Sequence, residues 1–355
     1  MSLQSVENLW LELIGRLRIP LDRDRPEVRA APVILCYHGV TTQRSQSAAT
    51  FAPQLDLQVL VEELERQLAW LKARRRVWPL DELIDAALSR HADARGAVAI
   101  TFDDGYANNL TVAWPLLKRY SMPATIFLAT GHIDGGGSLW WEAVPNLLAL
   151  CNTQVRFAGN SFDLATSKGK HELYAVLGKR LTFASLEEVR EIVAELHGLL
   201  GCKEVPSNNH MLTWRQVEAM DDPDLRFGMH GHSHVGLSRL SDATLEDDIH
   251  RCADALQAHV RHPSSCFAYP YGQPDDYDSR STDVLKRYGC RSAVTTSPGS
   301  FERASRFKVP RVSVRRSDPI NRFQAKLCGW DRPFWWPRTL VANVRGRRRG
   351  RAIRE

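Results

Sequence analysis

Short, largely apolar runs recur along this chain of 355 residues and are separated by longer stretches with apolar positions at helical spacing. Runs of this length predict buried strands, and the amphipathic stretches between them predict helices. The predicted strands are 33–37, 97–102, 124–128, 225–228, 265–268, 292–295 and 311–314. The predicted helices are 55–75, 81–88, 107–120 and a helix that begins near 241. This strand–helix–strand order predicts parallel pairing and an α/β fold.

One long stretch breaks this order. Residues 140–201 are mostly helical, with a small hairpin expected at 155–164, and the strand pattern resumes only at Leu225. We therefore expect a barrel-type domain over 31–318 that carries a helical insertion at about 138–212. An N-terminal amphipathic segment, 1–30, and an aromatic and basic C-terminal tail, 319–355, complete the predicted organisation.

The charge of the chain is unevenly distributed. The net charge is +6, but residues 303–355 alone hold 16 Lys/Arg and 3 Asp/Glu, which leaves the preceding residues at −7. A mildly acidic body gives no electrostatic reason to expect nucleic acid as a partner.

Localisation is predicted from what the sequence lacks. No apolar run approaches the roughly 18–20 residues of a membrane-spanning helix, and the first 20 residues have no secretory signal pattern. The 7 cysteines are scattered without a CxxC pair, which is typical of free thiols in a reducing compartment. These features predict a cytoplasmic protein.

Polar residues follow three of the predicted strands. The three stretches are Thr101-Phe102-Asp103-Asp104-Gly105, His230-Gly231-His232-Ser233-His234 and Tyr269-Pro270-Tyr271-Gly272. Because the carboxyl ends of parallel strands meet at one edge, we expect these stretches to lie together. Two adjacent carboxylates after a buried strand are costly unless a cation faces them. The simpler interpretation of Asp-Asp-Gly is a turn that ends the strand.

The histidine cluster favours a metal site over a structural role. If the segment is extended, His230, His232 and His234 share one face; if it curls, His230 and His234 meet and His232 points away. The spacing leaves both geometries open. The third stretch is typical of a turn, and it offers a backbone N–H for a developing oxyanion.

The order TFDDGYANN, FGMHGHSHVGLSRLS, FAYPYG and YGCRSAVTT, between about Val33 and Val314, resembles the polysaccharide deacetylase family, also called carbohydrate esterase family four. The resemblance implies a distorted (β/α) barrel of about seven parallel strands. It also implies hydrolysis of N-acetyl or O-acetyl groups on sugars with a divalent metal, commonly zinc.

The resemblance assigns a role to each matching residue. It makes Asp103 the catalytic base and the backbone amide of Tyr271 the oxyanion contact. The implied metal ligands are Asp104, His230 and His234, and the implied substrate-binding residues are Tyr269, Pro270 and Tyr271.

The sequence departs from the family pattern in three places. Gly231 follows the first histidine where Ser or Thr is common, and Ala268 stands where an arginine often orients the base. The usual Leu-x-Leu-His near the C-terminus, which supplies the general acid, is absent. The leaving amine still needs a proton, so His38 and His232 are the candidate donors. A hydrogen bond at the barrel rim is the structural alternative for His38.

The C-terminal tail predicts a membrane contact. Trp330, Trp335 and Trp336 precede a cluster of arginines at 345–354. Interfacial aromatics beside basic residues favour an anionic membrane surface. The alternative is that both chain ends pack on the barrel.

Together these patterns predict a metal-dependent hydrolase that removes N-acetyl groups from an amino sugar. The expected substrate is a glycan or a lipid-linked or nucleotide-linked saccharide, in the cytoplasm or at the inner membrane face. The alternatives are an amidohydrolase acting on a small non-sugar amide and a catalytically inactive glycan-binding protein.

Overall fold

The structure is a computed structural model of the whole chain. It describes residues 31–42, 51, 53–135, 139–201, 211–220, 222–297 and 299–327.

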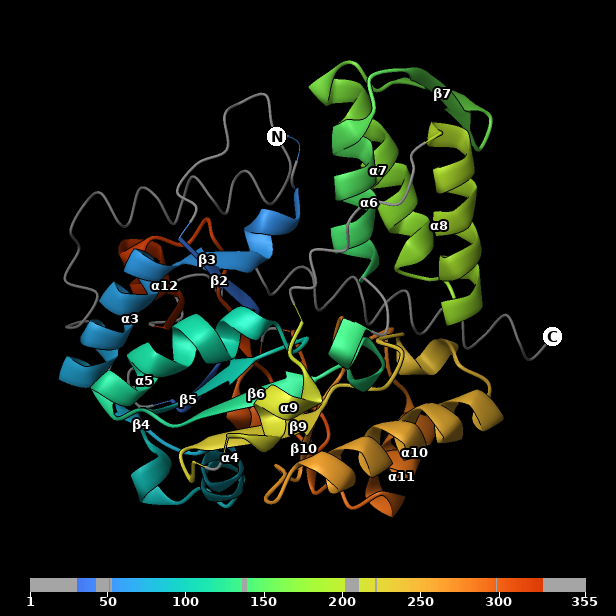
Figure 1. Cartoon of the computed structure of the whole chain (residues 1–355). Coiled ribbons are helices and arrows are strands. Elements are labelled where there is room, and N and C mark those ends of the chain that lie inside the picture. The colour runs from blue at the N-terminus through green and yellow to red at the C-terminus, as the bar shows by residue number, and fades with distance from the viewer. Residues whose placement is uncertain are drawn as a thin grey trace.

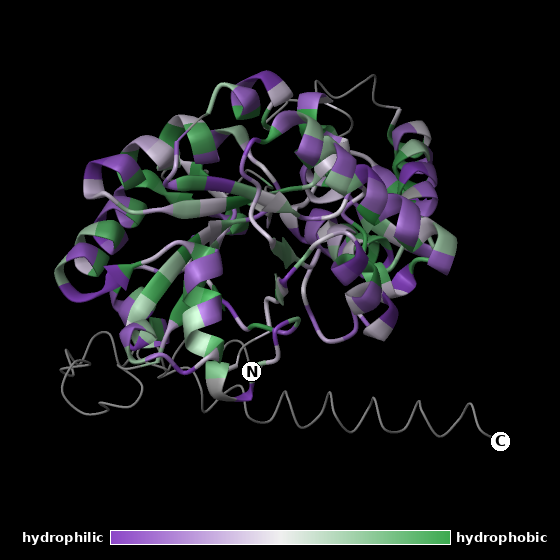
Figure 2. Cartoon of the chain, turned by 90° about the horizontal axis from the view of Figure 1, so that it is seen from below, coloured by the Kyte–Doolittle hydropathy of each residue, from purple (hydrophilic) through white to green (hydrophobic). Residues whose placement is uncertain are grey.

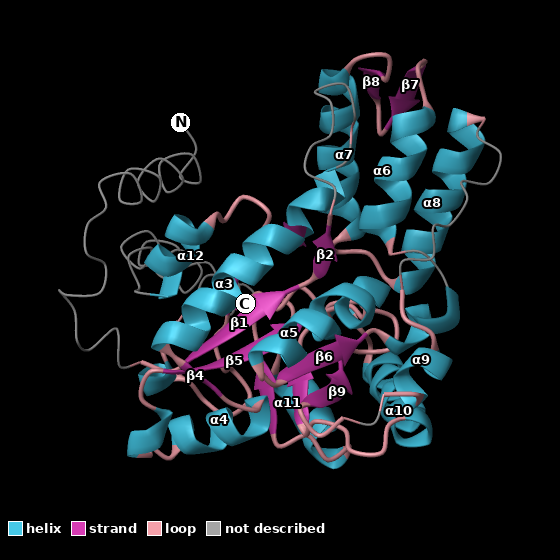
Figure 3. Ribbon diagram, turned by 60° about the vertical axis from the view of Figure 1, so that its left-hand side comes forward, coloured by secondary structure: helices cyan, strands magenta, loops and turns pink. Residues whose placement is uncertain are grey.

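Parallel strands form a half-barrel at the centre of the molecule, with helices around it (Figure 3). In spatial order the strands are β11 (Ser292–Val294), β10 (Cys266–Ala268), β9 (Leu225–Met229), β6 (Ala124–Leu128), β5 (Ala97–Phe102), β1 (Val33–Tyr37) and β12 (Val312–Ser313). A short strand, β4 (Arg76–Val77), also pairs with β5. The predicted α/β barrel of about seven parallel strands is confirmed.

The strands are apolar on both faces because both faces are covered. Every residue of β5 and β6 is buried. Alternate residues such as Leu35 and Ile100 pack against the surrounding helices. The other set contains smaller residues, such as Ala97 and Ala99, and packs with helix α4 (Leu80–Leu88) inside the half-barrel.

One segment near the C-terminus links the two outer strands. Val309 bridges to Val294 of β11, and three residues later β12 pairs with β1. The N–H of Thr295 donates to the Val309 carbonyl at 2.9 Å, and the N–H of Val314 donates to the Cys36 carbonyl at 2.9 Å. Residues 309–314 therefore close the barrel, and Arg311 lies inside this link.

Amphipathic helices surround the half-barrel. They are α3 (Val61–Arg74), α5 (Trp114–Tyr120), α9 (Trp214–Glu218), α10 (Asp242–His259), α11 (Ser279–Arg287) and α12 (Ile320–Leu327). A π-helical turn, Asn109–Ala113, precedes α5, and both lie within the helix predicted at 107–120. Figure 2 shows hydrophobic residues gathered along the strands and hydrophilic residues on the outer turns of the helices.

Shorter elements complete the barrel. Strands β2 (Gly39–Thr41) and β3 (Gln58–Leu60) form a separate parallel pair. The short 3-10 segments are Pro53–Leu57, Ala92–Ala94, Thr130–Gly135, Leu237–Arg239 and Phe301–Arg303. Cys36, Cys151, Cys252, Cys266 and Cys290 are buried and free. Within the described ranges, no helix has the length and apolar character needed to cross a bilayer.

Between β6 and β9 the chain forms a helical subdomain that stands beside the barrel (Figure 1). Its elements are α6 (Trp140–Leu150), the antiparallel hairpin β7 (Gln154–Phe157) and β8 (Asn160–Asp163), α7 (Ser167–Leu181) and α8 (Leu186–Leu200). Val144, Leu148, Leu177 and Leu196 belong to a hydrophobic core that is distinct from the barrel core. The helices and the hairpin thus form where the sequence predicts them.

The start of the predicted C-terminal tail belongs to the barrel. Helix α12 packs on α3, with the ring of Phe323 edge-on to Trp70 at 6.0 Å between centroids. Phe323 is fully buried, and Lys326 and Arg322 form ion pairs with the buried Asp318. The predicted boundary at residue 318 is therefore too early, because 320–327 complete the core. The predicted N-terminal segment, 1–30, and the tail from Cys328 onward lie outside the described residues.

We expect Phe323→Ala to lower the free energy of unfolding by about 3–5 kcal/mol, because it leaves a cavity beside Trp70. Asn321→Ala, on the exposed side of the same helix, is the matched control and should change it by less than about 0.5 kcal/mol. Urea unfolding of both variants measures the difference. Equal effects would mean that α12 does not stabilise the barrel.

Candidate active site

Three buried side chains converge at the carboxyl edge of the barrel. Asp104 follows β5, and His230 and His234 follow β9. The Oδ1 atom of Asp104 lies 3.4 Å from Nε2 of His230 and 3.2 Å from Nε2 of His234. One ligand atom from each residue lies within 4.8 Å of the others. The segment is therefore curled, and His232 points away to Thr130, with Nδ1 at 3.1 Å from Oγ1.

The hydrogen bonds around this cluster fit a bound cation. Nδ1 of His230 lies 2.7 Å from the Ala268 carbonyl, so it carries a proton and donates it. In the neutral ring, Nε2 then presents a lone pair to the Asp104 carboxylate. Two acceptors at this distance repel unless a proton or a metal lies between them. The Oδ2 atom of Asp104 is also buried without a partner, so these residues fit a divalent metal.

The histidine loop is held by Asp248 of α10. Its carboxylate accepts from the N–H of His232 at 2.9 Å and from the N–H of Ser233 at 2.8 Å. Gly231 has φ +77°, and a Cβ at this position would lie 3.0 Å from Asp248 Oδ2. The Ser or Thr common at this position in the family would therefore crowd the carboxylate that fixes the loop.

Asp104, His230 and His234 form a triad, and Asp103 lies next to it. Asp103 forms a bidentate ion pair with Arg311. Nη1 and Nη2 of Arg311 donate to the two carboxylate oxygens at 2.7 and 2.6 Å, and both side chains are buried. Burial alone would raise the pKa of Asp103, but the Arg311 guanidinium holds this pKa below its ordinary value. Asp103 is therefore ionised at neutral pH and able to accept a proton.

Arg311 is the functional residue that the sequence reasoning missed. The family's base-orienting arginine was sought at position 268, where the chain has alanine, and the guanidinium instead arrives from the segment that closes the barrel. Its Nε donates to the Thr295 carbonyl at 3.0 Å, and Nη1 also donates to Thr101 Oγ1 at 3.0 Å. The only available signal was a strand-flanking arginine in VPRVSV, far from TFDDG in the sequence.

His38 lies beside the base. Ligand atoms of Cys36, His38 and Asp103 lie within 4.8 Å of one another, but Arg311 already binds both oxygens of Asp103. Nδ1 of His38 is buried without a partner. Burial lowers the pKa of His38, so its ring is neutral at neutral pH. A neutral ring with a vacant nitrogen can take up a proton and pass it on. His232 is half-buried and directed away from the triad.

In the third predicted stretch, which begins at Tyr269, Tyr269 and Pro270 are buried in the core and Tyr271 lies at the site. Tyr269 is fully buried, stacks on Tyr277 with centroids 4.2 Å apart, and donates its hydroxyl proton to the Phe307 carbonyl. Pro270 is buried beneath Gly231. Neither side chain reaches the surface of the site, so a substrate contact of Tyr269 or Pro270 is left to the backbone, and their substrate-binding role stays a prediction.

Tyr271, in contrast, reaches the triad. Its ring is edge-on to His234 with centroids 5.1 Å apart, and its hydroxyl accepts from Trp140 Nε1 at 3.0 Å. Burial raises the pKa of Tyr271 to about 12, so the phenol stays protonated. Its φ is +59°, an uncommon backbone conformation for a non-glycine residue. Among the described residues no acceptor is found for its N–H.

A second buried carboxyl group lies near the triad. Tyr106 donates to Glu142 at 2.9 Å and accepts from Trp141 Nε1 at 3.1 Å, while the Trp141 ring packs on His234 with centroids 4.6 Å apart. Burial raises the pKa of Glu142 to about 7. This chain of contacts links the helical subdomain to a predicted metal ligand, and no sequence motif indicates it.

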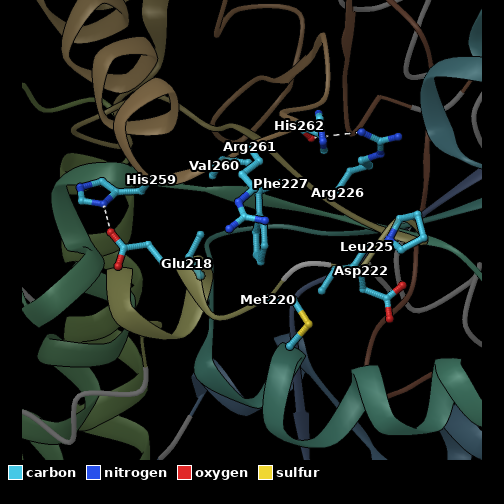
Figure 4. Close-up of a pocket in the computed structure, with 12 residues that line it drawn as sticks. Glu218, Met220, Asp222, Leu225, Arg226, Phe227, His259, Val260, Arg261 and His262 are labelled. Atoms are coloured by element: carbon cyan, nitrogen blue, oxygen red, sulfur yellow. Dashed lines mark hydrogen bonds and ion pairs between the residues drawn. The ribbon is translucent and has the colours of Figure 1, made fainter.

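The opposite edge of the barrel offers no comparable chemistry. A hollow there lies between the ends of α9 and α10 and the start of β9 (Figure 4). His259 and Glu218 form an ion pair across it at 2.6 Å, and Arg226 donates to the His262 carbonyl. The polar groups already satisfy each other, and no metal-type cluster is found there within the described ranges.

A parallel barrel with an Asp-His-His cluster and an arginine-bound aspartate at its carboxyl edge has the residue types of a hydrolytic site. The family profile of polysaccharide deacetylases matches residues 90–293, and the chain belongs to this family. YxkH of Bacillus subtilis, a protein named for the same family, is 32% identical over 104 residues, which cover 28% of this chain and 33% of YxkH. The match thus spans about a third of that relative.

Solved structures show the same fold. The Streptococcus pyogenes deacetylase PplD, in complex with acetate, matches with a TM-score of 0.54 and 18% identity, covering 84% of this chain and 98% of PplD. IcaB from Ammonifex degensii matches with a TM-score of 0.53 and 17% identity, covering 85% of this chain and 97% of IcaB. At these identities the likeness establishes the fold alone.

We expect Arg311→Met to lower the free energy of unfolding by about 3–5 kcal/mol at neutral pH, because it leaves a buried charge unpaired. The pKa of Asp103 is depressed in the folded protein, so the pair stabilises the fold above the unfolded pKa and loses this effect as pH falls through the folded pKa. The difference between wild type and variant should therefore shrink below about pH 4. Urea unfolding at several pH values measures it.

Arg315→Met is the matched control. Arg315 pairs with Asp56 at 2.8 Å on the surface, where both side chains are about half exposed. Such pairs contribute about 0–1 kcal/mol, so this variant should change stability little at any pH. If R311M changes the free energy of unfolding as little as R315M does, the pair with Arg311 does not keep Asp103 ionised.

Proposed function

We propose that this protein is a metal-dependent hydrolase that removes N-acetyl groups from an amino sugar in a glycan or a lipid-linked or nucleotide-linked saccharide. The observation that carries the proposal is the buried Asp104–His230–His234 cluster beside an Asp103 held ionised by Arg311. Membership of the polysaccharide deacetylase family supports it, as does the acetate named in the PplD complex.

The chemistry divides between the two neighbouring aspartates. Asp104, His230 and His234 would hold the divalent ion, proposed to be zinc, and the bound ion would supply Lewis-acid polarisation and lower the pKa of water. Asp103 accepts a proton from the attacking water, because it is ionised and has no role in holding the ion. Arg311 fixes the carboxylate so that it cannot turn toward the histidines.

The remaining residues act on the acyl group and the amine. The N–H of Tyr271 donates to the oxygen that becomes negative when water adds to the acetyl carbon. The C–N bond then breaks, giving acetate and the free amine. The amine takes up a proton, and His38 is the proposed donor because it lies beside Asp103 and its neutral ring can carry the proton that the water releases.

Asp103→Asn should abolish acetate release while the metal stays bound, and Asp104→Asn should remove the metal. The reason is that Asp103 contacts Arg311, whereas Asp104 contacts the histidines. Metal analysis of the purified variants, with acetate release from acetylated amino sugars, makes the comparison. Equal metal loss in both variants would contradict the division.

His38→Ala should lower kcat by roughly 10²–10⁴-fold with little change in metal content, because the amine loses its proton donor. His232→Ala is the matched control, since this ring is hydrogen-bonded to Thr130 and points away from the triad. If H38A retains the wild-type kcat while H232A loses it, the proton donor is His232.

Two alternatives follow from the same site. Hydrolysis of a small non-sugar amide needs the same groups, and acetate release from a panel of amides and acetylated sugars separates it. An inactive glycan-binding protein would have no need of an ionised base beside the metal-type cluster. A cytoplasmic location and a membrane contact of the C-terminal tail stay predictions from the sequence, because Trp330, Trp335 and Trp336 lie outside the described residues.

A further inference from the structure

A deep groove separates the helical subdomain from the barrel and ends at the predicted metal site. Its volume is about 370 Å³, which lies within the range of small-molecule pockets. On the barrel side the loops after β6, β9 and β10 line it, and His234 and Tyr271 belong both to the groove and to the site. A molecule whose acetyl group lies at the triad therefore extends into this groove.

The wall contributed by the subdomain is aliphatic. Helix α8 turns Ile192 and Leu196 toward the core of the subdomain, where both are buried. Val189 and Val193 lie on the flank of the same apolar face and are only partly buried by that core; together with Ala194 they line the groove. The apolar face of α8 is therefore wider than the subdomain core covers, and its flank faces the groove.

The polar groups of the groove lie mainly on its barrel side, where His132, His232, Ser233, His234 and Tyr271 line it. Each hydroxyl of a bound sugar that loses water needs a hydrogen-bond partner, and aliphatic side chains supply none. On α8 only Arg190 and His197 add polar atoms to the lining, and no carboxylate lines the groove anywhere. A polysaccharide chain along α8 would leave hydroxyls unpaired, whereas a hydrocarbon chain would bury apolar surface on both sides.

We propose that this groove binds a hydrocarbon chain attached to the acetylated sugar, so that the substrate is an amphiphile with its acetyl group at the triad. This assignment rests on the proposed function and narrows it to sugars that carry an apolar aglycone. Leu139, Trp140 and Leu181 also line the groove and add apolar contacts to those of Val189 and Val193.

The test compares the methyl and octyl glycosides of N-acetylglucosamine, which differ only in the alkyl chain. Each methylene that becomes buried should strengthen binding roughly fourfold. We therefore expect the octyl glycoside to bind at least about tenfold more tightly in tryptophan fluorescence titrations, with or without added zinc. In the zinc-loaded protein, kcat/KM for acetate release should rise by a similar factor, mainly through KM.

Groove variants identify where the chain binds. Val193→Thr replaces a methyl group by a hydroxyl of the same shape, and Ala194→Asp places a charge on the exposed edge of the groove wall. Both should reduce the octyl preference to less than about threefold and leave the methyl glycoside unaffected. Leu199→Asp is the matched control, because Leu199 lies on α8, is 45% exposed and does not line the groove.

Each outcome decides between the two proposals. Equal binding of both glycosides, or an octyl preference that survives V193T and A194D, overturns the groove assignment. A preference lost equally in L199D places the chain elsewhere and overturns it too. Tight octyl binding without acetate release keeps the groove and removes the deacetylase function on this sugar. Acetate release at equal rates from both glycosides supports the deacetylase function and overturns the groove assignment.

Discussion

The buried pair between Arg311 and Asp103 joins the architecture of the barrel to its chemistry. Asp103 directly follows β5, and Arg311 lies in the segment that links β11 to β1. A buried guanidinium without its carboxylate is strongly unfavourable, and the same holds for the carboxylate. Closing the barrel therefore brings the base its positive partner, and the ionised base in turn stabilises the closed barrel.

The site also depends on strained turns at the carboxyl edge. Asp104, His234 and Tyr271 are non-glycine residues with φ of +74°, +56° and +59°. Each follows a different strand, β5, β9 and β10, at the carboxyl edge of the barrel, and Asp104 and the Tyr271 ring both contact His234. Such conformations cost of order 1–3 kcal/mol each and persist only where the surroundings impose them. Here those surroundings include the glycine-containing turns and the carboxylate of Asp248.

The parts of the molecule that sequence predicts are those set by local patterns. Strands such as 97–102, buried on both faces, have a continuous apolar signature, and the metal-type residues lie in motifs of a few residues. Arg311 was missed because its partner is 208 residues away and only barrel closure brings them together. The third motif also gives no sign of which of its two tyrosines points into the core. The boundary at 318 is too early because the sequence pattern does not separate Phe323, which packs on Trp70, from the aromatic residues that follow it.

The helical subdomain adds contacts of its own around the residues at the carboxyl edge of the barrel. In the proposed reaction the triad, Asp103 and the Tyr271 amide would contact only the acetyl group, so they carry little information about the rest of the substrate. That information lies in α6 and α8, which form one wall of the groove, and in Trp141, which packs on His234. The same helix α6 carries Glu142, which accepts a hydrogen bond from Tyr106, two residues after Asp104. The subdomain therefore contacts the metal-type cluster both by packing and through hydrogen bonds. The groove wall and the predicted ligand His234 are therefore in contact through one structural element, α6.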